Sequence, residues 1–313
     1  MSFTKTREPF GGYTIITVAH KESANEIAII PEMGARLNKF QVNLHGESIG
    51  IIDGYSDGET LTDETYSKSS LLAPYPNRIA DGKYEFSGKK HQLDINKVGE
   101  NNAIHGFVSN KDFHLESSGI VEDYYELIFQ YVSEGAEGYP FPFKMTVTYR
   151  FGGVWLEVDT EITNLCKTEM PAGFGWHPYF KIGNNVSELR LRLPEVEKIA
   201  VDKRLIPTGK QKKYTDFANL SGIGNTEFDT GFHLTAGQGE VELFNELKGL
   251  YVTVSMMGED NPYKYVQLYI PPSRDSIAVE PMTCAANAFN NGLGLRILAP
   301  EESLRARFTI LVS

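Results

Sequence analysis

Apolar and polar residues alternate along most of this chain, and a period of two residues is typical of β-strands with one buried face. The clearest case is residues 154–162, where Leu156 and Val158 alternate with the acidic Glu157 and Asp159. The period of an amphipathic helix is nearly absent. The sequence therefore predicts an almost entirely β-stranded protein.

Turn residues separate these alternating segments. Gly152 and Gly153 stand between residues 145–150 and 154–162, which predicts an antiparallel hairpin. Residues 208–230 have the weakest pattern, so we expect a long loop there. Frequent strands without intervening helices predict a sandwich or barrel, and no linker divides residues 1–313, so we expect a single domain. Further strands are expected at residues 83–86, 91–93, 189–193 and 304–310.

Composition limits the function classes. The 313 residues are 41% hydrophobic, which is enough to bury a substantial core. The net charge of -11 would repel nucleic acids and anionic membrane surfaces, so we expect neither as a partner. The two cysteines, Cys166 and Cys284, form no disulfide framework, residues 1–12 are polar, and no apolar run reaches transmembrane length. We therefore expect a cytoplasmic protein with reduced thiols.

His177 stands in the most unusual local sequence. It follows Trp176 and precedes Pro178, Tyr179 and Phe180. Such an aromatic wall suits a sugar, whose C–H face packs on rings while its hydroxyl groups find polar partners. A buried histidine in an aromatic core is the alternative interpretation.

Glu280 follows the apolar residues 277–279 and precedes Pro281, which indicates a carboxylate at the end of an apolar strand. Burial there should perturb its pKa. A solvated glutamate at the surface is the alternative. Taken singly, Arg78 is better explained as a surface arginine paired with an acid, and His105 as a structural histidine.

One imidazole and one carboxylate are what acid/base chemistry near neutrality requires, because their reference pKa values are about 6.5 and about 4.3. The histidines do not stand at the spacings of metal ligands, so we expect no metal site. Nucleotide-binding glycine motifs and a nucleophile elbow are also absent from the sequence.

Three blocks in order resemble the aldose 1-epimerase (galactose mutarotase) family, in its shorter bacterial form. The first combines Pro76-Asn77-Arg78-Ile79, Gly82 to Gly88, and Asn102 to Gly106. The second is Gly175 to Phe180, and the third is Val279-Glu280-Pro281 with Asn287 and Gly292.

The resemblance implies a large antiparallel β-sandwich and assigns roles to matching residues. Glu280 matches the general base and His177 the general acid. His105 and Arg78 match groups that hydrogen-bond and polarise the sugar. The resemblance also implies sugar contacts by Asn77, the neighbour of Arg78 in the first block. Two more are expected from Asp229, whose block matches loosely, and from Trp176 in the aromatic wall.

The implied activity is interconversion of the α and β anomers of a free aldohexose by ring opening and closure, with no cofactor. Trp176 before His177 and Lys181-Ile182 after Phe180 depart from the block of well-characterised galactose mutarotases, which leaves the sugar open. A hexose-6-phosphate 1-epimerase and a non-catalytic carbohydrate-binding protein are the alternatives, and we expect a monomer or a homodimer. We also expect attraction between His177 and Glu280 to keep the imidazole largely protonated at neutral pH.

Overall fold

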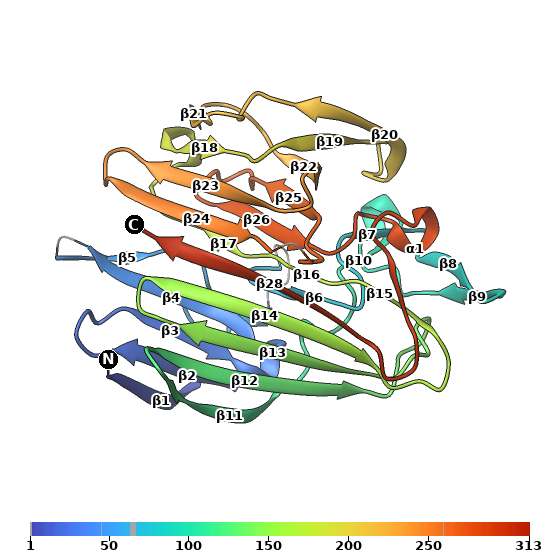
Figure 1. Ribbon diagram of the computed structural model, residues 1–313, viewed down its shortest axis with the longest axis horizontal. Helices are drawn as coiled ribbons and strands as arrows, with labels where there is room; N and C mark the ends of the chain where they lie inside the picture. Colours follow the sequence, from blue (N-terminus) through green and yellow to red (C-terminus); the bar gives the residue numbers. More distant parts are fainter. Residues whose placement is uncertain (1, 45, 63–66, 259) are drawn as a thin grey trace.

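The computed structural model describes residues 2–44, 46–62, 67–258 and 260–313 (Figure 1). Three large sheets of nine, eight and five strands dominate it. Their strand ladders run antiparallel, and the one α-helix of the described residues is the short α1 (Ala288–Asn291). These findings confirm the predicted all-β antiparallel fold. None of the described helices has the length and apolar character needed to cross a membrane.

The nine-stranded sheet contains the predicted hairpin. Strands β13 (Phe143–Phe151) and β14 (Trp155–Asn164) pair with Tyr149 opposite Val158, and Gly153 supplies the positive φ of 88° between them. Alternate residues of these strands are buried, as their sequence period requires. The order is β11 (His114–Val121), β12 (Tyr124–Ser133), β13, β14, β28 (Ser303–Val312), β24 (Leu250–Met256), β23 (Gly239–Asn245), β18 (Arg190–Arg192) and β21 (Ser221–Gly222).

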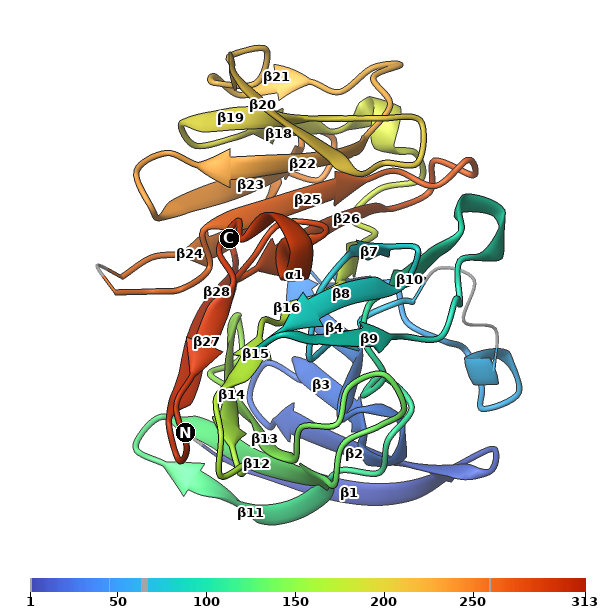
Figure 2. The ribbon, with the colours of Figure 1, turned by 90° about the vertical axis from the view of Figure 1, so that its right-hand side faces the viewer.

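The other two large sheets cover the inner face of the nine-stranded sheet (Figures 1 and 2). Phe151 meets Phe40 edge to face at 6.1 Å on one side, and Phe308 meets Trp176 at 6.5 Å on the other. The five-stranded sheet is a meander of β1 (Phe3–Phe10), β2 (Tyr13–His20), β3 (Glu26–Ile30), β4 (Arg36–Leu44) and β5 (Glu47–Gly50).

The eight-stranded sheet carries much of the candidate site. Its central strand β26 (Ile277–Met282) is buried along its whole length. Its side chains are therefore apolar, with the exception of one carboxylate. The order is β20 (Pro207–Tyr214), β19 (Val196–Val201), β22 (Asp229–Leu234), β25 (Tyr265–Tyr269), β26, β16 (Gly175–Trp176) and β6 (Leu71–Leu72), with β17 (Tyr179–Phe180) also on β26.

Small elements gather at one end of the sandwich, on the right of Figure 1. They bring the first sequence block beside the eight-stranded sheet. They are the strand pairs β7 (Arg78–Ala80) with β10 (Asn102–Ile104), β8 (Lys83–Phe86) with β9 (Lys89–Gln92), and β15 (Met170–Ala172) with β27 (Arg296–Leu298). The 3-10 helices of the described residues are η1 (Pro31–Met33), η2 (Thr60–Thr62), η4 (Val98–Glu100) and η5 (Val186–Glu188).

One sequence prediction is wrong at the edge of the eight-stranded sheet. The expected loop at residues 208–230 contains β20, which pairs with β19 at the edge of the eight-stranded sheet. Most β20 side chains are exposed, so the strand needs no apolar alternation and shows none. The strand expected at 189–193 is present but shorter, as β18.

Candidate active site

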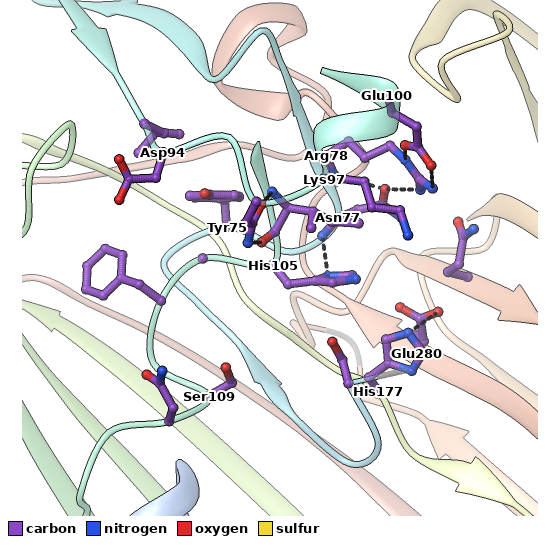
Figure 3. Close-up of a pocket in the computed structure, with 18 of the residues that line it drawn as sticks. Tyr75, Asn77, Arg78, Asp94, Lys97, Glu100, His105, Ser109, His177 and Glu280 are labelled. Atoms are coloured by element: carbon purple, nitrogen blue, oxygen red, sulfur yellow. Dashed lines mark hydrogen bonds and ion pairs between the residues drawn. The ribbon is translucent and has the colours of Figure 1, made fainter. Parts of the chain in front are cut away.

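A pocket of about 800 Å³ is lined by strands β22, β25 and β26 and by segments around β7 and β10 (Figure 3). Its polar walls and its size suit a small polar molecule. Six of the seven site residues predicted from the sequence line it, namely Asn77, Arg78, His105, His177, Asp229 and Glu280.

Glu280 lies inside β26 rather than at its end, because the strand continues through Pro281 to Met282. Gln267 on β25 stands opposite it in the register. The Glu280 side chain is 2% exposed, and its Oε2 atom has no hydrogen-bond partner among the described residues. A buried carboxylate oxygen without a partner is costly in a structural role, which favours a role in binding or chemistry.

His177 follows β16 and reaches the same wall of the pocket. Its backbone N–H donates to the carbonyl of Ser70 at 3.1 Å, and its carbonyl accepts from the N–H of Ser69 at 2.9 Å. The imidazole stacks on the ring of Tyr179, with ring centroids 4.9 Å apart. Its Nε2 atom lies 3.3 Å from Oε1 of Glu280 (Figure 3). Backbone pairing and ring stacking therefore fix the imidazole against the carboxylate.

Burial dominates the electrostatics of this pair. It lowers the pKa of His177 to about 3, and the charge of Arg78 acts in the same direction. Burial also raises the pKa of Glu280 well above its usual value; Asp229 adds to this rise and Arg78 opposes it. The expectation that attraction would keep His177 protonated is therefore contradicted, because the loss of solvation outweighs the attraction.

Trp176 lies outside the pocket lining, which contradicts its predicted contact with the sugar. Successive residues of an extended chain point to opposite faces, so His177 faces the pocket while Trp176 points into the sandwich. There it is 1% exposed, its Nε1 donates to Oγ1 of Thr160 at 3.0 Å, and its ring packs against Tyr149. The aromatic neighbour of the imidazole is instead Tyr179.

His105 faces the imidazole of His177 edge-on, with ring centroids 5.4 Å apart. The backbone N–H of Asn77 donates to its Nδ1 at 3.2 Å, so Nδ1 carries no proton. Burial holds the pKa of His105 well below its usual value, helped by the charge that His177 carries when protonated and by the charges of Arg78 and Lys97. The ring is therefore neutral with its proton on Nε2, which makes it a hydrogen-bond donor.

Gly106 explains how His105 is held in place. Both residues have φ near +66°, and the carbonyl oxygen of Ala73 would lie 1.8 Å from a Cβ at position 106. Only glycine avoids both the strain and the clash. The close approach of the two backbones brings the segment after β10 against residues 73–77.

Arg78 is buried and pairs with Glu100, a carboxylate that was not predicted from the sequence. Its Nε donates to Oε2 of Glu100 at 2.6 Å and its second terminal nitrogen, Nη2, donates to Oε1 at 3.3 Å. Nη1 donates to Oδ1 of Asn77 at 3.2 Å. The predicted pairing of Arg78 with an acid is present, but the pair lines the pocket rather than the surface.

Asp229 begins β22 at the rim of the pocket and stays exposed. Its Oδ1 accepts a hydrogen bond from Nε2 of Gln267 at 2.7 Å, and its Oδ2 lies 3.8 Å from Nη2 of Arg78. The amide of Gln267 thus orients the carboxylate of Asp229 at the rim of the pocket.

Gln267 and Glu100 were not predicted from the sequence. An amide in the buried strand 265–269 was a visible signal, because buried polar side chains usually have a bonding task. Glu100 carried no such signal, since nothing in its neighbourhood showed that it would meet Arg78. Among the described residues, no three histidine, cysteine, aspartate or glutamate side chains gather as a metal site.

The arrangement provides what reversible proton transfer to a polyhydroxylated ligand requires. Glu280 and His177 supply two proton-exchanging groups in direct contact. Around them stand donors on His105 and Arg78 and an acceptor on Asp229.

The sequence is similar to those of several known proteins. A protein of Escherichia coli K12 described as uncharacterized, YihR, is 29% identical over 247 residues, which cover 77% of each chain. Human galactose mutarotase is 27% identical over 208 residues, which cover 64% of this chain and 59% of that protein.

Solved structures show the same fold. A galactose mutarotase-like protein from Clostridium acetobutylicum superposes with a TM-score of 0.87 at 20% identity, covering 100% of this chain and 98% of the other. The model of the family described as aldose 1-epimerase matches residues 15–311. Because that match spans nearly the whole sequence, the chain belongs to the aldose 1-epimerase family.

Proposed function

We propose that the protein is a cofactor-independent isomerase that interconverts the α and β anomers of a free aldohexose. The observation that carries the proposal is the 3.3 Å contact between the imidazole of His177 and the buried carboxylate of Glu280 in the wall of a polar pocket. Membership of the family and the likeness to galactose mutarotases support it.

In the proposed reaction Glu280 takes the proton of the C1 hydroxyl while His177 gives a proton to the ring oxygen, so the C1–O bond of the ring breaks. The hemiacetal opens to an aldehyde, and rotation about C1–C2 presents the other carbonyl face. The two groups then return their protons in reverse, which closes the ring as the other anomer. The protein ends each cycle with the protons it started with.

The pair must reach its working protonation state before the ring opens. Burial favours the proton on Glu280 and a neutral His177. Reaction requires the same proton on His177, and the 3.3 Å contact needs to shorten only slightly for a direct transfer. Sugar hydroxyl groups that hydrogen-bond to the carboxylate replace its lost solvation and favour this transfer.

Three further residues would hold the sugar ring while C1 turns. Nε2–H of His105 and the free N–H groups of Arg78 donate to sugar oxygens, and Asp229 accepts from sugar hydroxyl groups. Several such anchors keep the reacting atoms near Glu280 and His177 through the open-chain stage.

A hexose 6-phosphate is the second candidate substrate, because the ammonium groups of Lys97 and Lys111 line the same pocket. A phosphate carries two negative charges that such cations would compensate. Figure 3 shows Lys97 on the same side of the pocket as Arg78.

Polarimetry of freshly dissolved α-D-glucose, α-D-galactose and α-D-glucose 6-phosphate tests the proposal. We expect the protein to accelerate the approach to anomeric equilibrium of at least one free hexose. Binding of a sugar, measured by calorimetry, without any acceleration would instead identify a non-catalytic carbohydrate-binding protein.

A further inference from the structure

Arg204 reaches from the turn between β19 and β20 to the segment that carries Glu100. Its Nε donates to the backbone carbonyl of Glu100 at 2.8 Å, and its Nη2 donates to the carbonyl of Asn101 at 2.7 Å. The same nitrogen lies 2.9 Å from Oδ1 of Asn102 and 2.9 Å from Oδ1 of Asp81. One guanidinium thus holds three successive residues of this segment, of which Asn102 is fully buried.

The turn that presents Arg204 is itself fixed. The Oδ1 atom of Asp202 accepts the backbone N–H groups of Arg204 at 2.8 Å and Ile206 at 3.0 Å. Leu205 has a positive φ of 61°, and its N–H donates to the carbonyl of Asp202. An aspartate that caps its own turn in this way restricts the backbone. The position of Arg204 is therefore set by the hairpin, independently of the pocket.

Glu100 passes this constraint to Arg78. Its carboxylate accepts two hydrogen bonds from the Arg78 guanidinium, and Nδ2 of Asn102 lies 3.4 Å from Oε2 of the same carboxylate. Burial raises the pKa of Glu100, but the hydrogen bond and the charge of Arg78 outweigh it, so the pKa falls below its usual value. Glu100 is therefore an ionised partner in a planar, two-bond pair.

This pairing decides which N–H groups of Arg78 remain for a ligand. A guanidinium has five N–H donors in a rigid plane. Glu100 takes two and Asn77 takes one, which leaves one N–H on Nη1 and one on Nη2, the nitrogen that lies 3.8 Å from Oδ2 of Asp229. Because the plane is rigid, the direction of those two follows from the position of the Glu100 carboxylate.

We propose that Arg204 is a positioning residue for sugar binding, acting through Glu100 on the orientation of Arg78. The proposal rests on the proposed function, because it assumes that Arg78 contacts an aldose. An isolated, half-exposed ion pair contributes little, but here one guanidinium makes four hydrogen bonds, two to the backbone carbonyls of Glu100 and Asn101 and two to the side chains of Asn102 and Asp81.

Kinetics of Arg204→Met, with the hexose that the wild type epimerises fastest, tests the proposal. We expect KM to rise about tenfold and kcat to change by less than about threefold, because binding geometry is lost while His177 and Glu280 stay in place. Arg192→Met is the matched control. Arg192 likewise pairs with a carboxylate, that of Glu242, but on the nine-stranded sheet, so KM and kcat should stay at the wild-type values.

A double-mutant cycle separates positioning from a general effect on the fold. If Arg204 acts through Arg78, then Arg204→Met should lower kcat/KM much less in an Arg78→Lys background than in the wild type. Equal losses in both backgrounds would overturn the proposal. Glu100→Gln should reproduce the KM effect, and it provides the test if Arg204→Met proves unstable.

A spectroscopic measurement tests the positioning role of Arg204 without relying on enzymatic activity. With arginine labelled by nitrogen-15, the Nε–H signal of Arg78, assigned through Arg78→Lys, should exchange slowly because it donates to Glu100. It should exchange faster or shift in Arg204→Met but not in Arg192→Met. An unchanged signal with an unchanged KM would disprove the positioning role. A changed signal in a protein that epimerises no aldose would instead disprove the proposed function alone.

Discussion

Nε2 of His177 lies 3.3 Å from Oε1 of Glu280, and the two side chains are only 8% and 2% exposed. The pair with one shared proton is neutral, whichever group holds the proton. Adding a second proton leaves a buried cation, and removing the first leaves a buried anion, and burial disfavours both. The pair is therefore built to keep one exchangeable proton over a wide range of pH.

Removing either group should abolish most turnover. We expect His177→Asn and Glu280→Gln each to lower kcat by about 10²- to 10⁴-fold, because each removes one partner of the proton transfer. Polarimetry measures the rate, and near-ultraviolet circular dichroism checks that the fold is kept. Wild-type rates in both folded variants would show that the chemistry lies elsewhere.

The pH dependence should show a broad plateau of kcat/KM. Its acid limb follows uptake of a second proton, and the pKa of His177 of about 3 displaces this limb to low pH. Its alkaline limb follows loss of the shared proton, and the raised pKa of Glu280 displaces it to high pH. In His177→Gln the glutamate must still ionise to act as base, so the acid limb should move upward.

Nuclear magnetic resonance of the His177 imidazole in the free protein checks the sign of this shift. The ring should be neutral at neutral pH and titrate well below its usual value of 6.5. Titration at or above that value would mean that attraction to Glu280 outweighs burial after all.

Trp176 should matter for stability and not for binding. We expect Trp176→Phe to lower the free energy of unfolding by about 1–3 kcal/mol, because it removes the bond to Thr160 and leaves space in the core. The KM for the sugar should stay near its wild-type value. In Trp155→Phe, which leaves only Trp176, saturating sugar should not change tryptophan fluorescence; a change would place the sugar near Trp176.

Asp229 should contribute to sugar affinity. We expect Asp229→Asn to raise KM by about 10- to 100-fold, because hydrogen bonds to a charged group contribute about 1.5–3 kcal/mol. Gln267→Leu should raise KM less, since it removes only the bond that orients Asp229. Equal KM values in Asp229→Asn and the wild type would remove this residue from the site.

A metal should not be needed for turnover. Because both proton-exchanging groups are side chains, dialysis against a chelator is expected to leave the polarimetric rate intact. Activity that disappears with the chelator and returns with one divalent metal would contradict the proposed mechanism.

The fold was predictable where strands have one buried face. In β13 and β14 the period of two residues is unbroken, so their pairing followed from the sequence. In β20, exposed along most of its length, packing imposes no period, and the strand could not be seen.

The site was predictable where motifs fix the residues, and less so where tertiary contacts do. His177 and Glu280 are far apart in the sequence, and only the family resemblance brought them together. The partnership of Arg78 with Glu100 depends on the path of the chain through η4, which no local pattern encodes. The prediction that Trp176 contacts the sugar was wrong. Aromatic composition shows that rings gather in a segment, but not which face of the sheet each ring occupies.

The edge strand β20 has a consequence for association. No strand of the described residues pairs with its outer side, and such an open backbone edge is a template for adding a strand from another molecule. Lys210, Lys212 and Lys213 stand exposed along it, so two copies pairing through this edge would bring like charges together. We therefore expect these lysines to disfavour sheet extension through β20, so that this edge is a poor contact for a homodimer.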